Sequence, residues 1–256
     1  MTRSKLKKSL NKRELLFGGW ISYDHPSIAE TFALTGFDFI SIDMEHAPIS
    51  LSSAQRIISI SQAYQIPCLP RPVSHSNDFF KPLLDSGADG LIVQMVETSY
   101  EVNKISNYIK YPPIGNRTYG VNRAHSFGLN FKQYITNWNE ESILIVQIES
   151  KEGVANIESI VSDPNVDGVM IGPYDLSGSL GVPGETNHPD VIYASKKVIE
   201  MCKKYNKSCG TQLSNPDLEN INNAINEGFT FIILSSDLFV LSNWAQSMKK
   251  TIRNFK

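Results

Sequence analysis

Short apolar runs rich in β-forming residues alternate along this chain with longer segments of helical periodicity. That alternation is typical of successive βα units, whose strands form a parallel sheet. The runs number eight: 16–22, 38–43, 66–71, 90–95, 143–149, 168–172, 208–213 and 229–235. Eight repeats in 256 residues predict a closed (β/α)₈ TIM barrel, built as a single domain spanning residues 1–256.

Helices are expected between these runs, at 51–64, 77–86, 100–109, 153–161, 189–205 and 216–227. Near the N-terminus, Leu6 and Leu10 are spaced i, i+4, which indicates a short amphipathic helix lying over one end of the fold. We expect its lysines to be solvated. The long irregular stretch 111–140 is expected beside the active-site mouth, as a lid or a subunit contact.

Composition excludes several classes of protein. A net charge of -2 provides no basic field for nucleic acid, and no apolar run is long enough to span a membrane. Cys68, Cys202 and Cys209 lack CxxC spacing and are expected to be reduced core thiols. The basic N-terminus is not followed by the apolar run of a signal peptide, so a cytoplasmic protein is expected. Neither GxGxxG nor GxxxxGK[ST] occurs.

Polar residues gather where the expected strands end, which is the active-site end of a (β/α)₈ barrel. They are Asp43, Glu45, His46, Arg71, Gln94, Gln147, Glu149 and Asp175. Charged groups on apolar strands are costly unless they are paired or bind a metal. The pattern therefore predicts a functional rim.

The two carboxylates Glu149 and Asp175 suit a hard six-coordinate cation such as Mg²⁺ or Mn²⁺. Their alternative role is structural, as helix caps or partners of Arg71. Asp43 lies close enough in sequence to orient the imidazole of His46 as a general base. Arg71 fits a carboxylate or a developing enolate, or else forms a salt bridge to Glu45 or Glu149.

Five segments, 37–48, 71–72, 111–117, 147–149 and 172–181, together resemble the HpcH/HpaI aldolase family of metal-dependent class II pyruvate aldolases. The likeness runs in order over nearly the whole chain. It implies a hexamer whose last helix swaps between subunits. Two departures bear on the acceptor aldehyde: Thr118 follows Arg117 where many members have glycine, and Tyr174 stands where many have alanine.

The resemblance also implies roles for individual residues. Glu149 and Asp175 would bind Mg²⁺, Mn²⁺ or Co²⁺, His46 with Asp43 would move the proton, and Arg71 would stabilise the enolate. Gln147 would lie near the metal and the substrate carbonyl. Backbone from Gly172 to Asp175 would contact the substrate carboxylate. Our candidates for the wall that meets the aldehyde are Trp20, Tyr174, Gln212 and Leu213.

The implied reaction is reversible aldol cleavage of a 4-hydroxy-2-oxo acid into pyruvate and an aldehyde, through a pyruvate enolate at the metal. A Schiff-base route has only Lys151 as an obvious candidate. One rival is an acyl-CoA lyase of the citrate or malyl-CoA lyase type, which a basic CoA-binding groove would favour. Another is a non-catalytic barrel that binds a keto acid or a partner protein.

Overall fold

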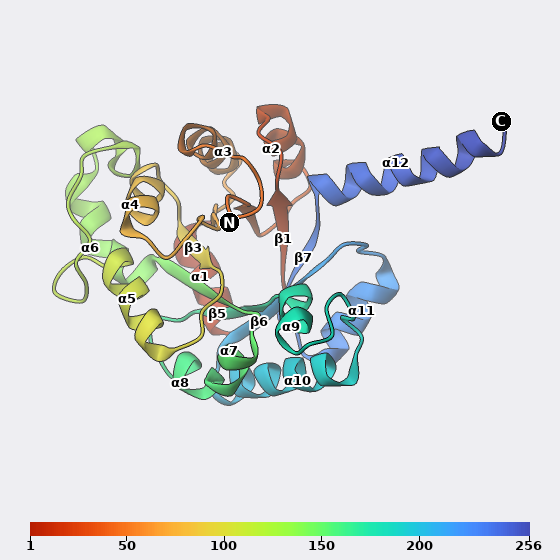
Figure 1. The fold of residues 1–256 in the computed structure, drawn as a ribbon. Helices are drawn as coiled ribbons and strands as arrows, with labels where there is room; N and C mark the ends of the chain where they lie inside the picture. Colours follow the sequence, from red (N-terminus) through yellow and green to blue (C-terminus); the bar gives the residue numbers. More distant parts are fainter.

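Seven parallel strands follow one another around a barrel in the computed structural model, which describes residues 1–256 (Figure 1). They are β1 (Leu16–Ile21), β2 (Phe39–Ile42), β3 (Gly90–Val93), β4 (Ile143–Ile148), β5 (Gly168–Ile171), β6 (Ser208–Leu213) and β7 (Phe231–Ser236). Their order is β2-β1-β7-β6-β5-β4-β3. This order leaves one gap in the ring, between β2 and β3.

Residues 66–71 fill that gap as an extended segment. Its backbone bonds to β2, where Arg71 N donates to Ile42 O at 2.8 Å, and to β3, where Ile92 N donates to Pro70 O at 3.1 Å. The barrel is therefore closed, as predicted, but the prediction of a regular strand at 66–71 is wrong. Proline has no N–H to donate, and Cys68 N donates to the Asp89 carboxylate instead, so no ladder forms on the β3 side.

Helices cover the outside of the barrel (Figure 1). They are α2 (Pro26–Ala33), α3 (Leu51–Ala63), α4 (Asn77–Asp85), α5 (Ser99–Ile109), α7 (Lys151–Ala155), α8 (Ile157–Val161), α9 (Pro173–Ser179), α10 (Pro189–Lys204) and α11 (Leu218–Glu227). The single helix expected at 153–161 is instead split into α7 and α8. The break is at Asn156, which leaves helical geometry and donates its side-chain amide to Glu97 O.

Alternation along the strands produces two hydrophobic cores. Side chains that point outward pack under the helices, and those that point inward, such as Phe39, Ile145 and Phe231, fill the barrel. Gly210 makes room for one of them, because a Cβ there would lie 2.1 Å from the Phe231 ring. Parity along a strand therefore decides whether a residue faces the helices or the barrel interior.

The N-terminal helix α1 (Arg3–Asn11) seals the amino-terminal end of the barrel. Leu6 and Leu10 are fully buried in the interior cluster, which confirms the helix expected there. The expectation of solvated lysines is wrong for Lys7, whose Nζ donates to Asp167 Oδ1 at 2.7 Å. Ion pairing thus fixes the helix over the opening that its leucines fill.

The segment 111–141 also lies at the amino-terminal end, and its expected place beside the active-site mouth is wrong. It contains η1 (Arg123–Gly128) and α6 (Phe131–Glu141), and it connects α5 to the start of β4. An αβ connection in a parallel barrel lies at the end opposite the strand carboxyl termini. Arg117 anchors it by donating to Asp85 Oδ1 at 2.8 Å.

The C-terminal helix α12 (Asp237–Arg253) leaves the barrel and projects away from it (Figure 1). Its apolar residues Val240, Leu241, Trp244 and Ile252 are exposed. None of the helices is both long and apolar enough to cross a membrane.

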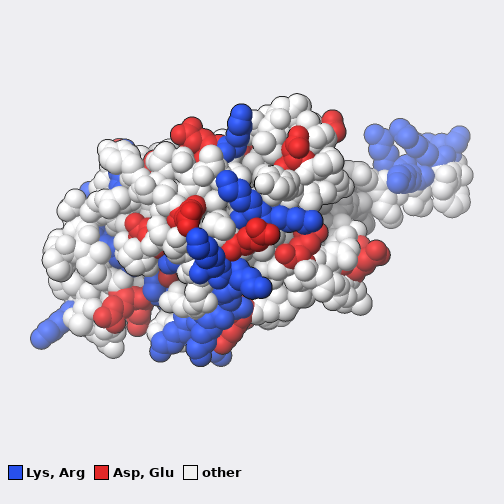
Figure 2. Space-filling view, turned by 90° about the horizontal axis from the view of Figure 1, so that it is seen from below, with Lys and Arg blue, Asp and Glu red and all other residues white.

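Figure 2 shows basic side chains gathered in a band on one face, with acidic groups beside them, so the small net charge is unevenly distributed.

Truncating the leucine seal should destabilise the fold. We expect Leu10→Ala to lower the free energy of unfolding by about 2 to 5 kcal/mol, because it opens a cavity in the barrel interior. Urea unfolding followed by tryptophan fluorescence measures the change. Leu129→Ala is the matched control, since Leu129 is 93% exposed and its loss should have little effect. Equal effects of the two changes would show that α1 does not seal the barrel.

Candidate active site

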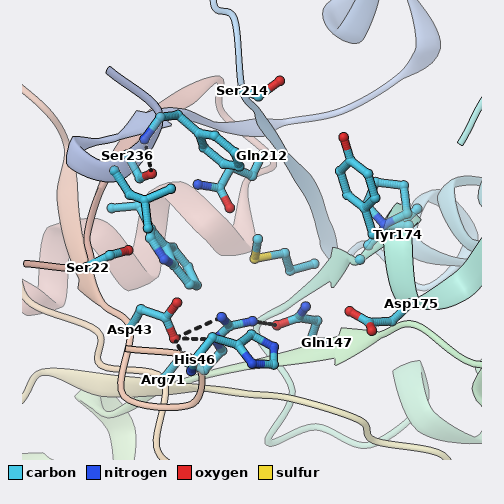
Figure 3. A pocket seen from close by; sticks show the side chains of 17 residues that line it. Ser22, Asp43, His46, Arg71, Gln147, Tyr174, Asp175, Gln212, Ser214 and Ser236 are labelled. Carbon is cyan, nitrogen blue, oxygen red and sulfur yellow. Dashed lines mark hydrogen bonds and ion pairs between the residues drawn. The ribbon is translucent and has the colours of Figure 1, made fainter. Parts of the chain in front are cut away.

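A cavity of about 370 Å³ opens at the carboxyl ends of the strands (Figure 3). Its lining comes from nearly every part of the barrel: Trp20, Ser22, Asp43, His46, Arg71, Gln147, Met170, Ile171, Gly172, Pro173, Tyr174, Asp175, Gln212, Ser214, Ser236, Leu238 and Phe239. Most of the polar residues predicted for the rim are in this set. Glu149, Glu45 and Gln94 are not, but Glu149 and Glu45 contact members of it.

Arg71 lies at the centre of a buried ion-pair cluster. Its Nη2 donates to Asp43 Oδ1 at 2.9 Å, and its Nη1 lies 3.0 Å from Glu45 Oε2. Nη1 also donates weakly to Gln147 Oε1 at 3.4 Å. The guanidinium carbon lies 4.8 Å from the centre of the Trp20 ring, a cation–π contact. These contacts fix the arginine in the cavity. They include the salt bridge to Glu45 that the sequence analysis gave as an alternative role for Arg71.

Asp43 does not orient the imidazole of His46, contrary to the sequence prediction. Its Oδ1 accepts from the backbone N–H groups of Glu45 and His46, both at 3.1 Å, and so shapes the turn after β2. The His46 side chain is 64% exposed, and its Nε2 lies 3.6 Å from Glu45 Oε2. Glu45, which the sequence analysis assigned only to Arg71, is therefore the carboxylate nearest to this histidine.

Glu149 continues the inward-facing row of β4 and is buried. Its Oε1 accepts from Met95 N at 2.7 Å, and its Oε2 accepts from the Gln147 amide. The pKa of Glu149 is raised to about 7, mainly by burial and in smaller part by the negative charges of Asp175 and Glu45, while the backbone bond from Met95 and the charge of Arg71 lower it. Too little positive charge from the chain lies near this carboxylate to stabilise its ionised form fully.

Gly172 allows the end of β5 to approach Glu149 closely. A Cβ at this position would lie 2.4 Å from Glu149 Oε2 and 2.9 Å from Gln147 Nε2. Pro173 then begins α9, whose first turn has no side-chain cap, and Asp175 in that turn faces the cavity (Figure 3). The two predicted metal ligands thus follow neighbouring strands at one rim, Glu149 directly after β4 and Asp175 in the helical turn after β5.

The donor set fits a hard divalent cation. Glu149 and Asp175 offer carboxylate oxygens, and a cation between them would offset the charge that raises the pKa of Glu149. No group of three or more His, Cys, Asp or Glu side chains is arranged so that it could hold a metal ion, so protein groups do not form a closed cage. Two carboxylates leave coordination positions for water or for substrate oxygens.

Three of the four predicted wall residues, Trp20, Tyr174 and Gln212, line the cavity, but Leu213 does not. Leu213 packs against the outer core, because neighbouring residues of a strand face opposite sides.

The sequence analysis missed Ser22, Ser214 and Ser236. The alternation of side chains along a strand could have identified Ser22 and Ser214, because each lies two positions after a predicted cavity residue, Trp20 or Gln212. Ser236 faces the cavity because the β1–β7 register shifts between Gly18 and Trp20, and no sequence signal marks that shift.

Comparison with known proteins gives a consistent result. The family model described as HpcH/HpaI aldolase/citrate lyase matches residues 16–243. A hydroxypyruvate/pyruvate aldolase from Roseobacter denitrificans is 34% identical over 245 residues, covering 94% of each chain. A 2-keto-3-deoxy-L-rhamnonate aldolase from Klebsiella pneumoniae is 31% identical over 252 residues, covering 98% of this chain and 92% of that protein.

Comparison with solved structures points to the same family. An HpcH/HpaI aldolase/citrate lyase family protein from Burkholderia cenocepacia superposes with a TM-score of 0.90 at 30% identity, covering 98% of this chain and 99% of the other. A citrate synthase superposes with a TM-score of 0.83 at 26% identity, covering 97% of each chain. The chain therefore belongs to the HpcH/HpaI aldolase/citrate lyase family and is an aldolase, a carbon–carbon lyase, of that family.

Proposed function

We propose that this aldolase is a class II enzyme that reversibly cleaves a 4-hydroxy-2-oxo acid into pyruvate and an aldehyde. The observation that carries the proposal is that Arg71 and Asp175 line one cavity of an aldolase-family barrel, with the buried Glu149 directly behind its lining residues Gln147 and Gly172. Mg²⁺, Mn²⁺ or Co²⁺ held by Glu149 and Asp175 would act as a Lewis acid on the 2-oxo carbonyl. No lysine lines the cavity, which favours this chemistry over a Schiff base on Lys151.

The chain's own residues supply the remaining steps. Arg71 is held against the Trp20 ring, so its fork can face the oxygen on which enolate charge develops. His46 is accessible and would take the proton from the 4-hydroxyl group as the carbon–carbon bond breaks. Glu45, 3.6 Å from His46 Nε2, would stabilise the protonated imidazole. Gln147 and the backbone from Gly172 to Asp175 would contact the oxo acid.

The same lining weighs against the acyl-CoA lyase alternative. A CoA diphosphate favours a groove of cationic side chains. Arg71 is the only lysine or arginine of the cavity, and it already contacts Asp43 and Glu45. We therefore favour cleavage of a free oxo acid. A non-catalytic oxo-acid-binding barrel would have no need for an accessible histidine beside this rim.

Removing the metal should abolish activity. We expect chelator to stop aldol cleavage and Mg²⁺, Mn²⁺ or Co²⁺ to restore it, as followed by pyruvate release. Glu149→Gln and Asp175→Asn should each weaken Mn²⁺ binding in calorimetry, because each removes a ligand charge. Glu152→Gln, on the exposed start of α7, is the matched control and should bind normally. Full activity in excess chelator, or borohydride trapping of pyruvate on a lysine, would contradict the class II assignment.

Arg71 should act on the enolate and not on the metal. Arg71→Ala should leave Mn²⁺ affinity at or above the wild-type value, since a positive charge leaves the rim. It should strongly reduce exchange of pyruvate methyl protons with solvent, measured by NMR in heavy water with Mg²⁺. Arg71→Lys should rescue poorly, because a point charge lacks the planar fork.

Arg56→Ala is the control for this experiment, since Arg56 forms an exposed ion pair with Asp24 outside the cavity. Circular dichroism checks the fold, because Arg71→Ala also leaves Asp43 and Glu45 without their partner. Wild-type exchange in metal-loaded Arg71→Ala would show that the arginine is only a structural ion-pair residue.

We also propose that the chain forms a homo-oligomer, a hexamer as the family resemblance implies, in which α12 packs on a neighbouring subunit. The exposed apolar face of α12 supports this, because isolated apolar faces are rarely left in water. Light scattering should give an oligomer for the wild type and smaller species for Leu241→Asp with Trp244→Asp. Gln246→Asp with Ser247→Asp, at exposed positions of the same helix, is the charge-matched control. A monomeric wild type would contradict the proposal.

A further inference from the structure

One wall of the cavity carries hydrogen-bonding groups that have no side-chain partner within the chain. The Gln212 side chain makes no hydrogen bond, and its backbone belongs to the β6–β7 ladder. Ser22 and Ser214 take part in hydrogen bonds only through backbone atoms, Ser22 N to Asp237 and Ser214 O from Ser235 and Asn243. All three side chains line the cavity. Their donors and acceptors are therefore available to a ligand.

This wall lies opposite the charged rim (Figure 3). Arg71, Gln147 and Asp175 lie on one side of the cavity, and Ser22, Gln212 and Ser214 lie on the other. An oxo acid bound at the rim would direct its reactive carbon into the intervening space. The opposite wall is then where the second reactant must lie.

The opposite wall contains no cation. Its other lining side chains, Ser236, Leu238 and Phe239, are neutral, and every lining carboxylate or arginine belongs to the rim. Arg71 belongs to the rim, where it contacts Asp43 and Glu45, so it supplies no counter-charge to this wall. An aldehyde with its own carboxylate or phosphate would lose hydration there without gaining a counter-charge.

The position of this wall is fixed by one buried carboxylate. Asp237 accepts from Ser22 N at 2.8 Å, Tyr23 N at 2.9 Å and Leu238 N at 2.8 Å, and so joins the end of β1 to the start of α12. Ser22 and Leu238 are thereby held on the same side of the cavity. The hydrogen-bonding groups of the wall therefore have a fixed spacing, which a specificity site requires.

We propose that Gln212, Ser22 and Ser214 form the aldehyde subsite, and that it selects uncharged aldehydes bearing a hydroxyl group close to the carbonyl. The inference rests on the proposed function. In the addition direction, a carbon–carbon bond forms between the methyl carbon of pyruvate and the aldehyde carbon. The proton lost from the methyl group is balanced by the proton that the new hydroxyl gains. Polar groups that bind a substrate hydroxyl discriminate against analogues that lack it, since those leave the groups unpaired.

The test compares pairs of aldehydes in the Mg²⁺-loaded enzyme with pyruvate. Glycolaldehyde and acetaldehyde differ by one hydroxyl, and succinic semialdehyde and butanal differ by one carboxylate at equal chain length. We expect Gln212→Leu to lower the ratio of kcat/KM for glycolaldehyde over acetaldehyde by about tenfold, the value of one lost hydrogen bond. Ser22→Ala should lower the ratio less. Butanal should exceed succinic semialdehyde in the wild type.

Exposed controls with the same chemical changes are Gln133→Leu on α6 and Ser27→Ala on α2, and both should keep the wild-type ratio. Exchange of pyruvate methyl protons needs no aldehyde, so in every variant it reports enolate formation separately from aldehyde binding. Normal exchange with an unchanged ratio in both Gln212→Leu and Ser22→Ala would overturn the subsite alone. A preference for succinic semialdehyde over butanal would overturn the charge argument. Absence of exchange in the wild type would overturn the proposed function and the subsite together.

Discussion

One buried guanidinium, that of Arg71, holds the charged rim of this barrel together. Asp43 and Glu45 both contact it, and burying these carboxylates without a counter-charge would cost several kcal/mol, on the order of 3 to 5 for a broken buried pair. The Trp20 ring beneath the guanidinium fixes its plane. The turn after β2, shaped by Asp43, and the position of His46 therefore depend on the same cluster.

The two sides of the cavity divide the chemistry between them. The side formed by β2 and the segment 66–71 supplies Arg71 and the accessible histidine, and the β4–β5 side supplies Glu149 and Asp175. Gln147 bridges the sides, because it accepts from Arg71 and donates to Glu149. An oxo acid between them would meet a cation on one side and a planar donor on the other. That division explains why residues so distant in sequence act on one small molecule.

Much of this could be predicted from sequence because strand parity and strand ends have simple rules. The closed barrel and the gathering of polar groups at one rim follow from them, and the leucine seal of α1 follows from the i, i+4 spacing of Leu6 and Leu10. Leu213 was predicted to line the cavity, but it directly follows Gln212 in the strand and therefore faces the outer core. The partner of the His46 ring could not be predicted, since spacing does not distinguish a carboxylate that bonds the backbone from one that bonds the ring. The prolines in 66–71 prevent a regular strand from forming there, but the segment still closes the barrel.

Anomalous diffraction from crystals grown with Mn²⁺ and oxalate, a stable mimic of the pyruvate enolate, tests the central claim most directly. The account predicts one strong manganese peak within coordination distance of both Glu149 and Asp175, with the oxalate on the metal and the Arg71 fork facing an oxalate oxygen. A manganese peak elsewhere, or no peak at this rim at saturating Mn²⁺, would contradict it.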